Sequence, residues 1–402
     1  MRVLHLSLTD FRNYESAEVS FARGPNLFVG RNGQGKTNLV ESLGYLATLS
    51  SHRVSSDSAL IRQGRDAAIV RARLESADRE LLAEVQINRS SPNRAQINRG
   101  AIKPRELPRY FSSILFAPED LALVRGEPSG RRRFLDELLV ARSPRFTGVL
   151  SDYERVLRQR NTLLKSARAS RVPADKLSTL DIWDDRLVSL GTEIIAGRDE
   201  LVTLLRPRVA ASYSSVAGDD HAAALALVTS VRDTPVDDDG APVATSSGAD
   251  PERLTALQIE PLFRDALRRV RPSELDRGVT LVGPHRDDLF LSLNGLPARG
   301  YASHGESWSF ALALKLASAA VLRTDSVTGD PVIVLDDVFA ELDRSRRERL
   351  ADAVADYEQV LITAAVEEDV PERLAAHTVR ISKGTIVTDE EPARVADGEE
   401  PA

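Results

Sequence analysis

The chain has 402 residues, a formal net charge of −7 and no cysteine. This length is sufficient for two or three domains with a substantial core. The absence of cysteine excludes a disulfide framework, a thiol nucleophile and a cysteine-ligated zinc site. The N-terminus lacks the apolar core of a signal peptide, and no apolar run approaches the ~20 residues of a membrane span. The sequence therefore predicts a cytoplasmic protein without a membrane partner.

The acidic balance conceals an uneven distribution of charge. Between Arg99 and Arg171 there are 16 basic and 8 acidic residues, while acidic residues gather at 237–239 and in the C-terminal tail. A basic stretch is typical of a nucleic-acid-binding surface, but it is also typical of solvated helix faces. Charge alone therefore leaves DNA binding open.

Residues 1 to about 115 have the pattern of an α/β unit. Apolar and alternating runs predict strands near 2–8, 17–22, 26–29, 67–74, 80–87 and 113–116. The segment Gly30-Arg31-Asn32-Gly33-Gln34-Gly35-Lys36-Thr37 follows the third of these strands and fits the phosphate-loop pattern G-x-x-x-x-G-K-[ST]. Apolar residues at helical spacing then predict a helix over 38–48.

The chemistry of phosphate binding requires these residue types in this order. Glycines let backbone N–H groups wrap the phosphates, and the N-terminus of the following helix adds a positive dipole end. Lys36 reaches the β- and γ-phosphates, and the Thr37 hydroxyl holds Mg²⁺. The sequence therefore predicts that ATP and Mg²⁺ bind here.

The rest of the chain alternates helical and strand-like segments. Helical periodicity covers 131–213, with Pro144 and Pro173 at the breaks, and indicates antiparallel helices. The Gly-, Asp-, Pro- and Ser-rich stretch near 217–251 is expected to be mobile around one possible strand at 222–228. Later patterns predict strands at 279–283, 289–293, 332–335 and 360–363, and helices at 306–322 and 344–357.

Two further segments complete a nucleotide site. The apolar strand before Asp336 and Asp337 predicts an Mg²⁺-side carboxylate at Asp336, while Asp337 is placed to orient or deprotonate the attacking water. Ser303 and Gly305 precede a helix and can present a hydroxyl and N–H groups to an anion, although they can equally be a simple helix cap. Their spacing before the Asp336 strand matches the ABC-type signature, and Asp343 matches the D-loop.

These motifs together resemble the RecF family of SMC-like DNA repair ATPases along nearly the whole chain. The resemblance extends to four further segments, namely Leu8–Tyr14, Leu115–Leu121, Arg131–Asp136 and Gly283–Asp288. It implies an ATP-dependent homodimer on single-stranded or gapped DNA, slow ATP hydrolysis, recombination-mediator partners, recombinase loading and a part in the SOS response. In that dimer, Lys36 and Thr37 of one subunit face Ser303 of the other.

The sequence also departs from the ABC pattern. His304 replaces the second signature glycine, Asp337 stands where many ABC ATPases have glutamate, and Thr363 occupies the place of the switch histidine. Two positions are candidates for the Q-loop, namely Gln63 and residues 118–120. His285 and Arg286 either face the site or belong to a turn held by Arg–Asp pairing.

The predicted fold is α/β, an ABC/SMC-type phosphate-loop ATPase head with an inserted helical lobe. We expect residues 1–125 and 276–387 to form the two halves of the head and 126–275 the helical lobe, with a disordered acidic tail at 388–402. Two alternatives are a stand-alone kinase or NTPase acting on a small molecule, and an ABC transporter subunit. The sequence shows no pattern of an acceptor pocket, which the first alternative needs, and nothing that resembles a membrane-coupling partner, which the second needs.

Overall fold

The computed structural model describes residues 1–76, 79–170, 178–218, 221–232, 255–326 and 329–387. Most of the predicted mobile segment at 217–251, and all of the predicted tail at 388–402, lie outside the described residues. The chain divides into two compact units, described separately below. The first contains Met1–Pro118 and Val327–Ala402, and the second contains Glu119–Ser326.

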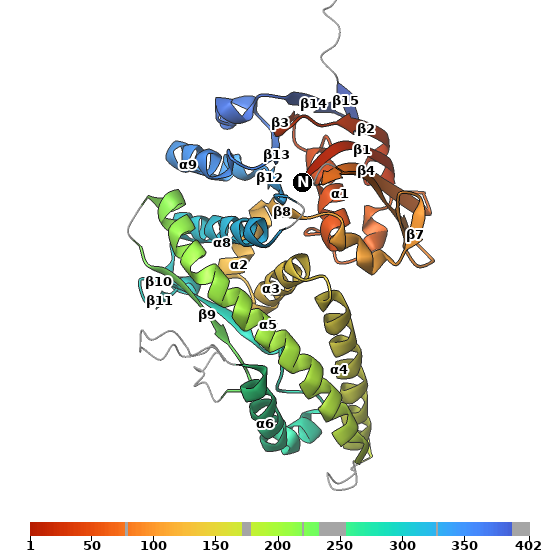
Figure 1. The fold of residues 1–402 in the computed structure, drawn as a ribbon, viewed down its shortest axis with the longest axis vertical. Coiled ribbons are helices and arrows are strands. Elements are labelled where there is room, and N and C mark those ends of the chain that lie inside the picture. Colours follow the sequence, from red (N-terminus) through yellow and green to blue (C-terminus); the bar gives the residue numbers. More distant parts are fainter. Residues whose placement is uncertain (77–78, 171–177, 219–220, 233–254, 327–328, 388–402) are drawn as a thin grey trace, which may run out of the picture. The chain divides into compact units, whose positions relative to one another are not determined.

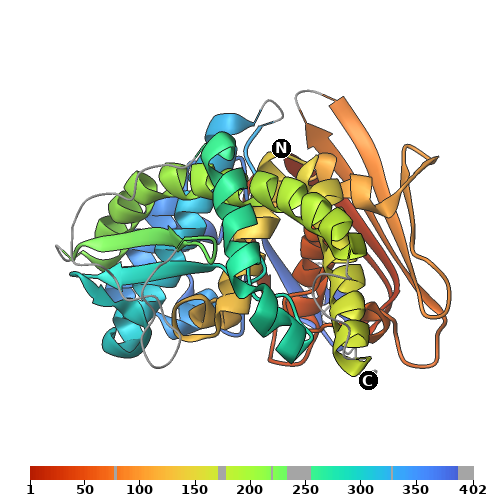
Figure 2. The same cartoon turned by 90° about the horizontal axis from the view of Figure 1, so that it is seen from below.

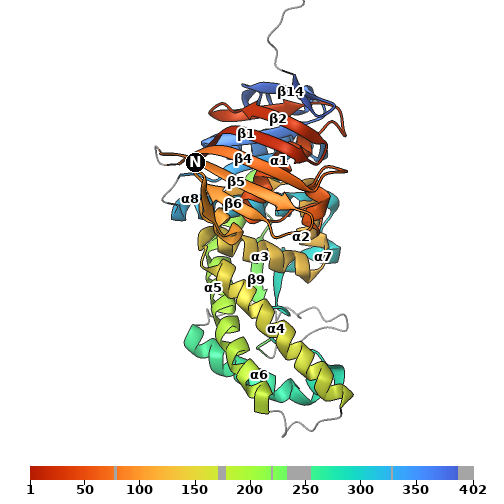
Figure 3. The same ribbon diagram turned by 90° about the vertical axis from the view of Figure 1, so that its right-hand side faces the viewer.

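The first unit has an antiparallel sheet of six strands with the order β2-β1-β4-β5-β6-β7. Figure 3 shows this sheet face-on, with β2 to β6 following one another in that order. Its strands are β1 (Arg2–Phe11), β2 (Tyr14–Ser20), β4 (Ala67–Ser76), β5 (Arg79–Asn88), β6 (Arg94–Ile97) and β7 (Gly100–Ile102). Side chains alternate between buried and exposed along β4, so one face of the sheet contributes to a core.

A second sheet of the same unit carries the phosphate loop. Its order is β15-β14-β3-β13-β12-β8, and all neighbours except β14 and β15 pair in parallel. The strands are β3 (Gly24–Val29), β8 (Ser113–Phe116), β12 (Val332–Asp336), β13 (Gln359–Ala364), β14 (Thr378–Ser382) and β15 (Thr385–Val387). Because β3, β13 and β12 are parallel neighbours, the residues that follow them meet at one edge of the sheet.

Helix α1 (Lys36–Thr48) contacts strands of both sheets and joins them into one core. Its apolar stripe is fully buried at Leu39, Val40, Leu43 and Leu46. Burial of each such side chain stabilises the fold by about 1.5–3 kcal/mol, so this helix is held rigidly behind the phosphate loop. Helix α9 (Arg344–Val354) and short 3₁₀ helices at Asp57–Leu60, Pro104–Arg109, Val338–Glu341, Glu367–Asp369 and Glu372–Leu374 complete the unit.

The second unit is mainly helical. Its helices are α2 (Leu121–Arg125), α3 (Pro128–Arg142), α4 (Phe146–Ala169), α5 (Ser178–Ala217), α6 (Ala256–Arg277), α7 (Ala298–Tyr301) and α8 (His304–Asp325). A small sheet has the order β11-β10-β9, with strands β9 (Ala223–Val228), β10 (Asp288–Leu293) and β11 (Leu296–Pro297). Helix α6 packs against both α4 and α5, as Figures 1 and 2 show from two directions.

A buried arginine joins these three helices. The Arg160 guanidinium of α4 is 0% exposed and donates to Asp184 Oδ1 on α5 at 2.7 Å and to Glu274 Oε2 on α6 at 2.6 Å. It also donates to Thr280 Oγ1 at 2.8 Å. A buried charge is tolerated when it is paired and hydrogen-bonded, and two carboxylates and a hydroxyl provide these partners here.

Most predicted elements are confirmed, with instructive exceptions. The predicted strand at 279–283 is wrong: these residues form an irregular turn after α6, in which Thr280 and Gly283 are held by side chains. The sequence patterns predict no separate helix at α6, because it contains the helix breakers Pro261 and Pro272. Thr255 and Gln258 nevertheless form a capping box at its start.

The compact units also divide the chain differently from the domain boundaries expected from the sequence. Residues 276–326 were expected in the head, but they group with the helices of the second unit. The physical reason is that α8 packs extensively along α5.

Candidate functional site

The phosphate loop joins the buried strand β3 to α1, the arrangement that its sequence pattern predicts. Gly35 caps the helix with φ +116°, a conformation that an L side chain rarely adopts. A Cβ on Gly30 would lie 2.3 Å from the carbonyl oxygen of Ile381, so only glycine fits there. The loop thus has the backbone shape that lets N–H groups face a phosphate.

Two neighbouring segments brace the loop from outside. Asn13 Nδ2 and Tyr14 OH, from the turn between β1 and β2, donate to the carbonyls of Gln34 and Gly35 at 3.2 and 3.1 Å. From the β14–β15 turn, the N–H of Gly384 donates to the Gln34 carbonyl at 3.0 Å. Sequence reasoning assigned no role to the β14–β15 hairpin, whose contact with the loop spans about 350 residues of chain.

Lys36 is held inside the loop and is only 3% exposed. Its ammonium donates to the carbonyl of Gly30 at 2.8 Å and lies within 3.4 Å of Asn32 Oδ1. A buried ammonium needs acceptors, and here they are carbonyl and amide oxygens of the loop itself. The positive charge is therefore concentrated at the loop centre, where a triphosphate would be neutralised.

Thr37 and Asp336, the two residues that the sequence suggests as magnesium ligands, meet across 299 residues of sequence. Thr37 Oγ1 donates to Asp336 Oδ1 at 3.1 Å. Thr363, at the end of the intervening strand β13, donates to the same oxygen at 2.6 Å. A hydroxyl and a carboxylate beside a phosphate loop are the protein ligands that Mg²⁺ commonly takes together with phosphate oxygens. The residues present therefore fit this ion.

Asp337 follows in a strained backbone conformation, with φ +51°. Its N–H donates to Thr363 Oγ1 at 3.0 Å, and its carboxylate lies 4.0 Å from the Lys36 ammonium. Strain of this kind in a non-glycine residue persists only when the surroundings enforce it, and it gathers at functional sites. Thr363, at the position where the sequence comparison with ABC ATPases expects the switch histidine, thus holds the Asp336 carboxylate and the Asp337 backbone N–H.

A pocket of about 150 Å³ brings part of the predicted site together. Its lining contains six of them together with two that sequence reasoning missed, and it consists of Asn32, Gly33, Gly35, Lys36, Thr37, Asn38, Arg53 and Asp337. Arg53 Nη1 donates to Asn38 Oδ1 at 2.8 Å, which places a second cation at this pocket. Arg53 lies beyond the loop motif, so no sequence spacing indicated it.

Behind the pocket, Glu41 connects α1 to its surroundings. Arg12 donates to both of its carboxylate oxygens at 2.8 and 2.6 Å, and Ser51 Oγ donates at 2.5 Å. Burial by itself would raise the pKa of Glu41, but the hydrogen bonds from Arg12 and Ser51 outweigh it, so the pKa lies below its usual value. The pair fixes the N-terminal motif against the helix that carries the phosphate loop.

Asp343, which the sequence matches to the D-loop, is the N-cap of α9. Its carboxylate accepts from the N–H of Arg346 at 2.9 Å and from the Arg346 guanidinium at 2.8 Å. The backbone hydrogen bond is the main cause that holds the pKa of Asp343 below its usual value. Asp343 is therefore an ionised helix cap at the surface of the first unit.

The signature loop belongs to the second unit and has the geometry of a capped helix start. Ser303 Oγ accepts from the N–H of Glu306 at 3.3 Å, and Glu306 Oε2 accepts from the N–H of Ser303 at 2.7 Å. Ser303 and His304 are exposed. This capping box is the structural role that the sequence left open, and it leaves Ser303 and Gly305 at the accessible N-terminus of a 22-residue helix.

The Gly283–Asp288 motif forms a turn held by arginine–aspartate pairing, one of the two alternatives for His285 and Arg286. The Arg131 guanidinium donates two hydrogen bonds of 2.7 Å to the Asp288 carboxylate, and Tyr153 OH lies 2.8 Å from His285 Nδ1. Burial lowers the pKa of His285 to about 4 and raises that of the adjacent Asp287 to about 6. The motif connects helices of the second unit.

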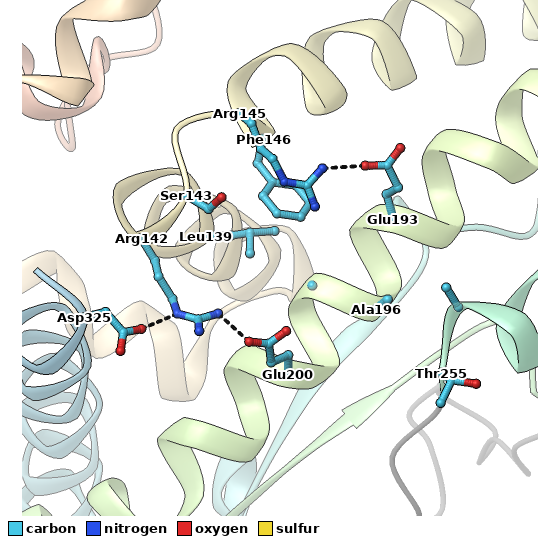
Figure 4. Close-up of a pocket in the computed structure, with 12 residues that line it drawn as sticks. Leu139, Arg142, Ser143, Arg145, Phe146, Glu193, Ala196, Glu200, Thr255 and Asp325 are labelled. Atoms are coloured by element: carbon cyan, nitrogen blue, oxygen red, sulfur yellow. Dashed lines mark hydrogen bonds and ion pairs between the residues drawn. The ribbon is translucent and has the colours of Figure 1, made fainter.

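A wider cavity of about 850 Å³ in the second unit lies among the ends of α3 and α8, the start of α4 and α6, and the middle of α5. Figure 4 shows that its arginines point toward acidic partners. Arg142 pairs with Glu200 at 2.9 Å and with Asp325, and Arg145 pairs with Glu193 at 2.8 Å. No predicted site residue lines it, and its paired charges identify no ligand.

No helix within the described ranges is both long and apolar enough to cross a membrane.

Comparison with known proteins identifies the family. The family model described as "RecF/RecN/SMC N terminal domain" matches residues 2–387. Two similar proteins named "DNA replication and repair protein RecF" come from Leifsonia xyli subsp. xyli and Clavibacter sepedonicus. The first is 66% identical over 96% of this chain and 99% of its own length. The second is 63% identical over 100% of this chain and 98% of its own length.

Solved structures agree with this result. A structure described as the recombination mediator protein RecF-ATP in the RecFOR pathway has a TM-score of 0.83 at 26% identity and covers 96% of both chains. An Smc head domain from Pyrococcus furiosus is alike in fold, with a TM-score of 0.52 at 15% identity, over 96% of this chain and 94% of that one. The predicted ABC/SMC-type fold is confirmed, and the kinase and transporter alternatives lose their basis. The chain therefore belongs to the RecF/RecN/SMC N-terminal domain family and, within it, to the RecF proteins.

Proposed function

We propose that this chain is an ATP-dependent DNA-binding protein of DNA replication and recombinational repair. The observation that carries the proposal is the contact between Thr37 and Asp336 at 3.1 Å beside the buried Lys36, in a chain of this family. The RecF-ATP structure that it resembles supports ATP as the nucleotide. The names of the relatives support DNA repair, and the protein would act in the cytoplasm with other recombination mediators.

Within one subunit, each side chain has a defined task toward ATP and Mg²⁺. Lys36 would exchange its acceptors on the loop for β- and γ-phosphate oxygens, and Arg53 adds charge at the same pocket. Thr37 and Asp336 would hold Mg²⁺, which neutralises charge on the phosphates. Asp337 would orient or deprotonate the water, and its short side chain suits slow turnover because it reaches less far than glutamate.

The second subunit would complete the site. Ser303 and Gly305, at the N-terminus of α8, can direct a hydroxyl, N–H groups and a helix dipole toward the partner's γ-phosphate. Asp343 would contribute from the D-loop. ATP then has different affinities for open monomers and for the closed dimer, so it acts as a switch.

Ion pairing within the chain separates the basic residues into two groups, which supports one location for contacts to DNA phosphates. Much of the basic stretch in the second unit is already paired, as at Arg142, Arg145 and Arg158. In the first unit a group of exposed basic residues has no ion pair to any residue within the described ranges: Arg94, Arg99, Lys103, Arg105 and Arg109. We place contacts to single-stranded or gapped DNA on this group, where counterion release would make affinity fall with salt.

Charge reversal tests this placement. The double substitution Lys103→Glu, Arg105→Glu should weaken DNA binding. The slope of log affinity against log salt should become shallower by the equivalent of roughly one to two phosphate contacts. Arg155→Glu with Arg158→Glu on α4 is the matched control, because both arginines are exposed but paired. If the control pair weakens binding as much as the first pair, the contact lies elsewhere.

Sedimentation of the purified protein with and without ATP tests the proposal as a whole. We expect ATP to convert monomers to dimers, and Lys36→Met to prevent this because removing the buried ammonium weakens ATP binding by roughly 2–4 kcal/mol. A small-molecule kinase need not dimerise with ATP. A wild-type protein that binds ATP but stays monomeric at every concentration would contradict the switch.

A further inference from the structure

One exposed aromatic side chain stands beside the signature loop. Tyr301, the last residue of α7, is 69% exposed. The large apolar side chains that are exposed within the described ranges include six aliphatic ones and this single aromatic one. Leu296, 52% exposed, belongs to the same short segment, so two of the seven lie within eight residues that end at Ser303. Leu257 and Leu262 lie as close together on α6, so what distinguishes Tyr301 is its aromatic ring and its place two residues before Ser303.

The segment is rigid, so the exposure of Tyr301 is not that of a loose loop tip. The Arg125 guanidinium donates to Ser307 Oγ at 3.1 Å and to the Ala302 carbonyl at 3.4 Å, on either side of Ser303. Ser307 Oγ in turn donates to the Ser303 carbonyl at 2.8 Å, and the Ala302 N–H donates to the Ala298 carbonyl at 3.0 Å. A large side chain held in place before binding loses little entropy when it is buried.

We propose that Tyr301 is an anchor of the ATP-dependent dimer and packs against the partner subunit around its bound nucleotide. This inference rests on the proposed function, because Ser303 must face the partner's nucleotide. Two residues of chain span at most about 7 Å, so an interface that has Ser303 at its centre reaches the backbone of Tyr301, whose exposed ring is available to it. The occupant of this surface is therefore a second copy of this chain.

The chemistry of the side chain fits that place. Tyrosine is enriched at the energetic centres of interfaces, since it buries a large apolar ring and keeps a hydroxyl for a polar partner. A nucleotide site offers such mixed surroundings, with phosphate, ribose and base edges beside protein. Tyr301 would contribute affinity, whereas Ser303 and the helix N-terminus contribute recognition of the γ-phosphate.

Substitution tests the anchor. Tyr301→Ala should leave ATP binding to the monomer unchanged and weaken ATP-induced dimerisation about tenfold or more, measured by sedimentation over a concentration series. Tyr301→Phe should stay close to the wild type. Leu257→Ala on α6 is the matched control, because Leu257 is 87% exposed and far along the chain from the signature loop. Tyr301→Ala dimers within twofold of wild-type affinity would overturn the proposal.

The absence of cysteine allows a second, positional readout. In Tyr301→Cys, the single thiol should react quickly with a maleimide in the monomer. If the variant still dimerises with ATP, the nucleotide should protect the thiol from the maleimide. If the substitution removes the anchor completely, the variant should not dimerise with ATP. Dimerisation with undiminished labelling would overturn the proposal, and Leu257→Cys should label equally with and without ATP. A wild-type protein that does not dimerise with ATP would instead refute the proposed function on which this inference rests.

Discussion

Replacing Arg160 with methionine should strongly destabilise the second unit. The substitution keeps most of the volume but removes three hydrogen bonds, to Asp184, Glu274 and Thr280. Asp184 retains Arg271 as a partner, whereas Glu274 is fully buried and would keep only the N–H of Leu281. Leaving a buried charge uncompensated costs about 3–5 kcal/mol. For a unit of about 200 residues, this corresponds to a fall in Tm of roughly 6–20 °C.

The assay exploits the positions of the tryptophans. Trp183 and Trp308, the two tryptophans of the chain, both lie in the second unit, so intrinsic fluorescence follows the unfolding of that unit. Arg158→Met is the matched control on the same helix, because Arg158 is exposed and its ion pair within the described residues is with exposed Glu154. That control should cost less than about 1 kcal/mol. Equal midpoints of denaturation for the two variants would refute the assignment of Arg160 as the charge that joins α4, α5 and α6.

Three further outcomes are expected. Asp337→Asn should spare ATP binding but slow hydrolysis by about 10²- to 10⁴-fold, since the amide cannot accept a proton, and an unchanged turnover rate would move the role to another carboxylate. Thr363→Val should lower ATPase activity about 10- to 100-fold, because Asp336 and the Asp337 N–H lose the hydroxyl that orients them; activity equal to the wild type would make that hydroxyl dispensable. Between about pH 4 and 6 the raised pKa of Asp287 makes the native chain bind the extra proton, so its contribution to stability falls as pH rises, whereas the lowered pKa of His285 gives an opposing rise. Asp287→Asn should therefore make stability, measured by denaturant titration, increase with pH by about 1.4 kcal/mol per unit more steeply than in the wild type, and parallel profiles would contradict this.

Local patterns predicted the parts of the fold that depend on neighbouring residues. The phosphate loop between β3 and α1, and the buried strand that ends at Asp336, are local features, and the structure has both. Local patterns do not predict α6, because its two prolines are helix breakers. Packing against α4 and α5 compensates for the hydrogen bonds that these prolines remove. The predicted strand at 279–283 has apolar residues, but the segment forms a turn, in which Val282 belongs to the core of the second unit.

The candidate site divides in the same way. Lys36, Thr37 and Asp336 were predictable because the chemistry of phosphate and Mg²⁺ demands them at known places in a motif. The sequence places Thr363 at the switch position, but its hydrogen bonds depend on strand order, and the contribution of Arg53 depends on a turn beyond α1. The role of Ser303 is of a third kind, since its capping geometry is visible in one subunit and its proposed ligand belongs to another.

Light scattering of Ser303→Arg with and without ATP tests the central claim most directly. The account predicts that the variant binds ATP as a monomer but does not dimerise, because the arginine side chain would fill the space between the helix N-terminus and the partner's γ-phosphate. If Ser303 is only a helix cap, the variant should lose about 1 kcal/mol of stability and dimerise normally. Normal ATP-induced dimerisation of Ser303→Arg would contradict the two-subunit site and leave a phosphate-loop ATPase that acts alone.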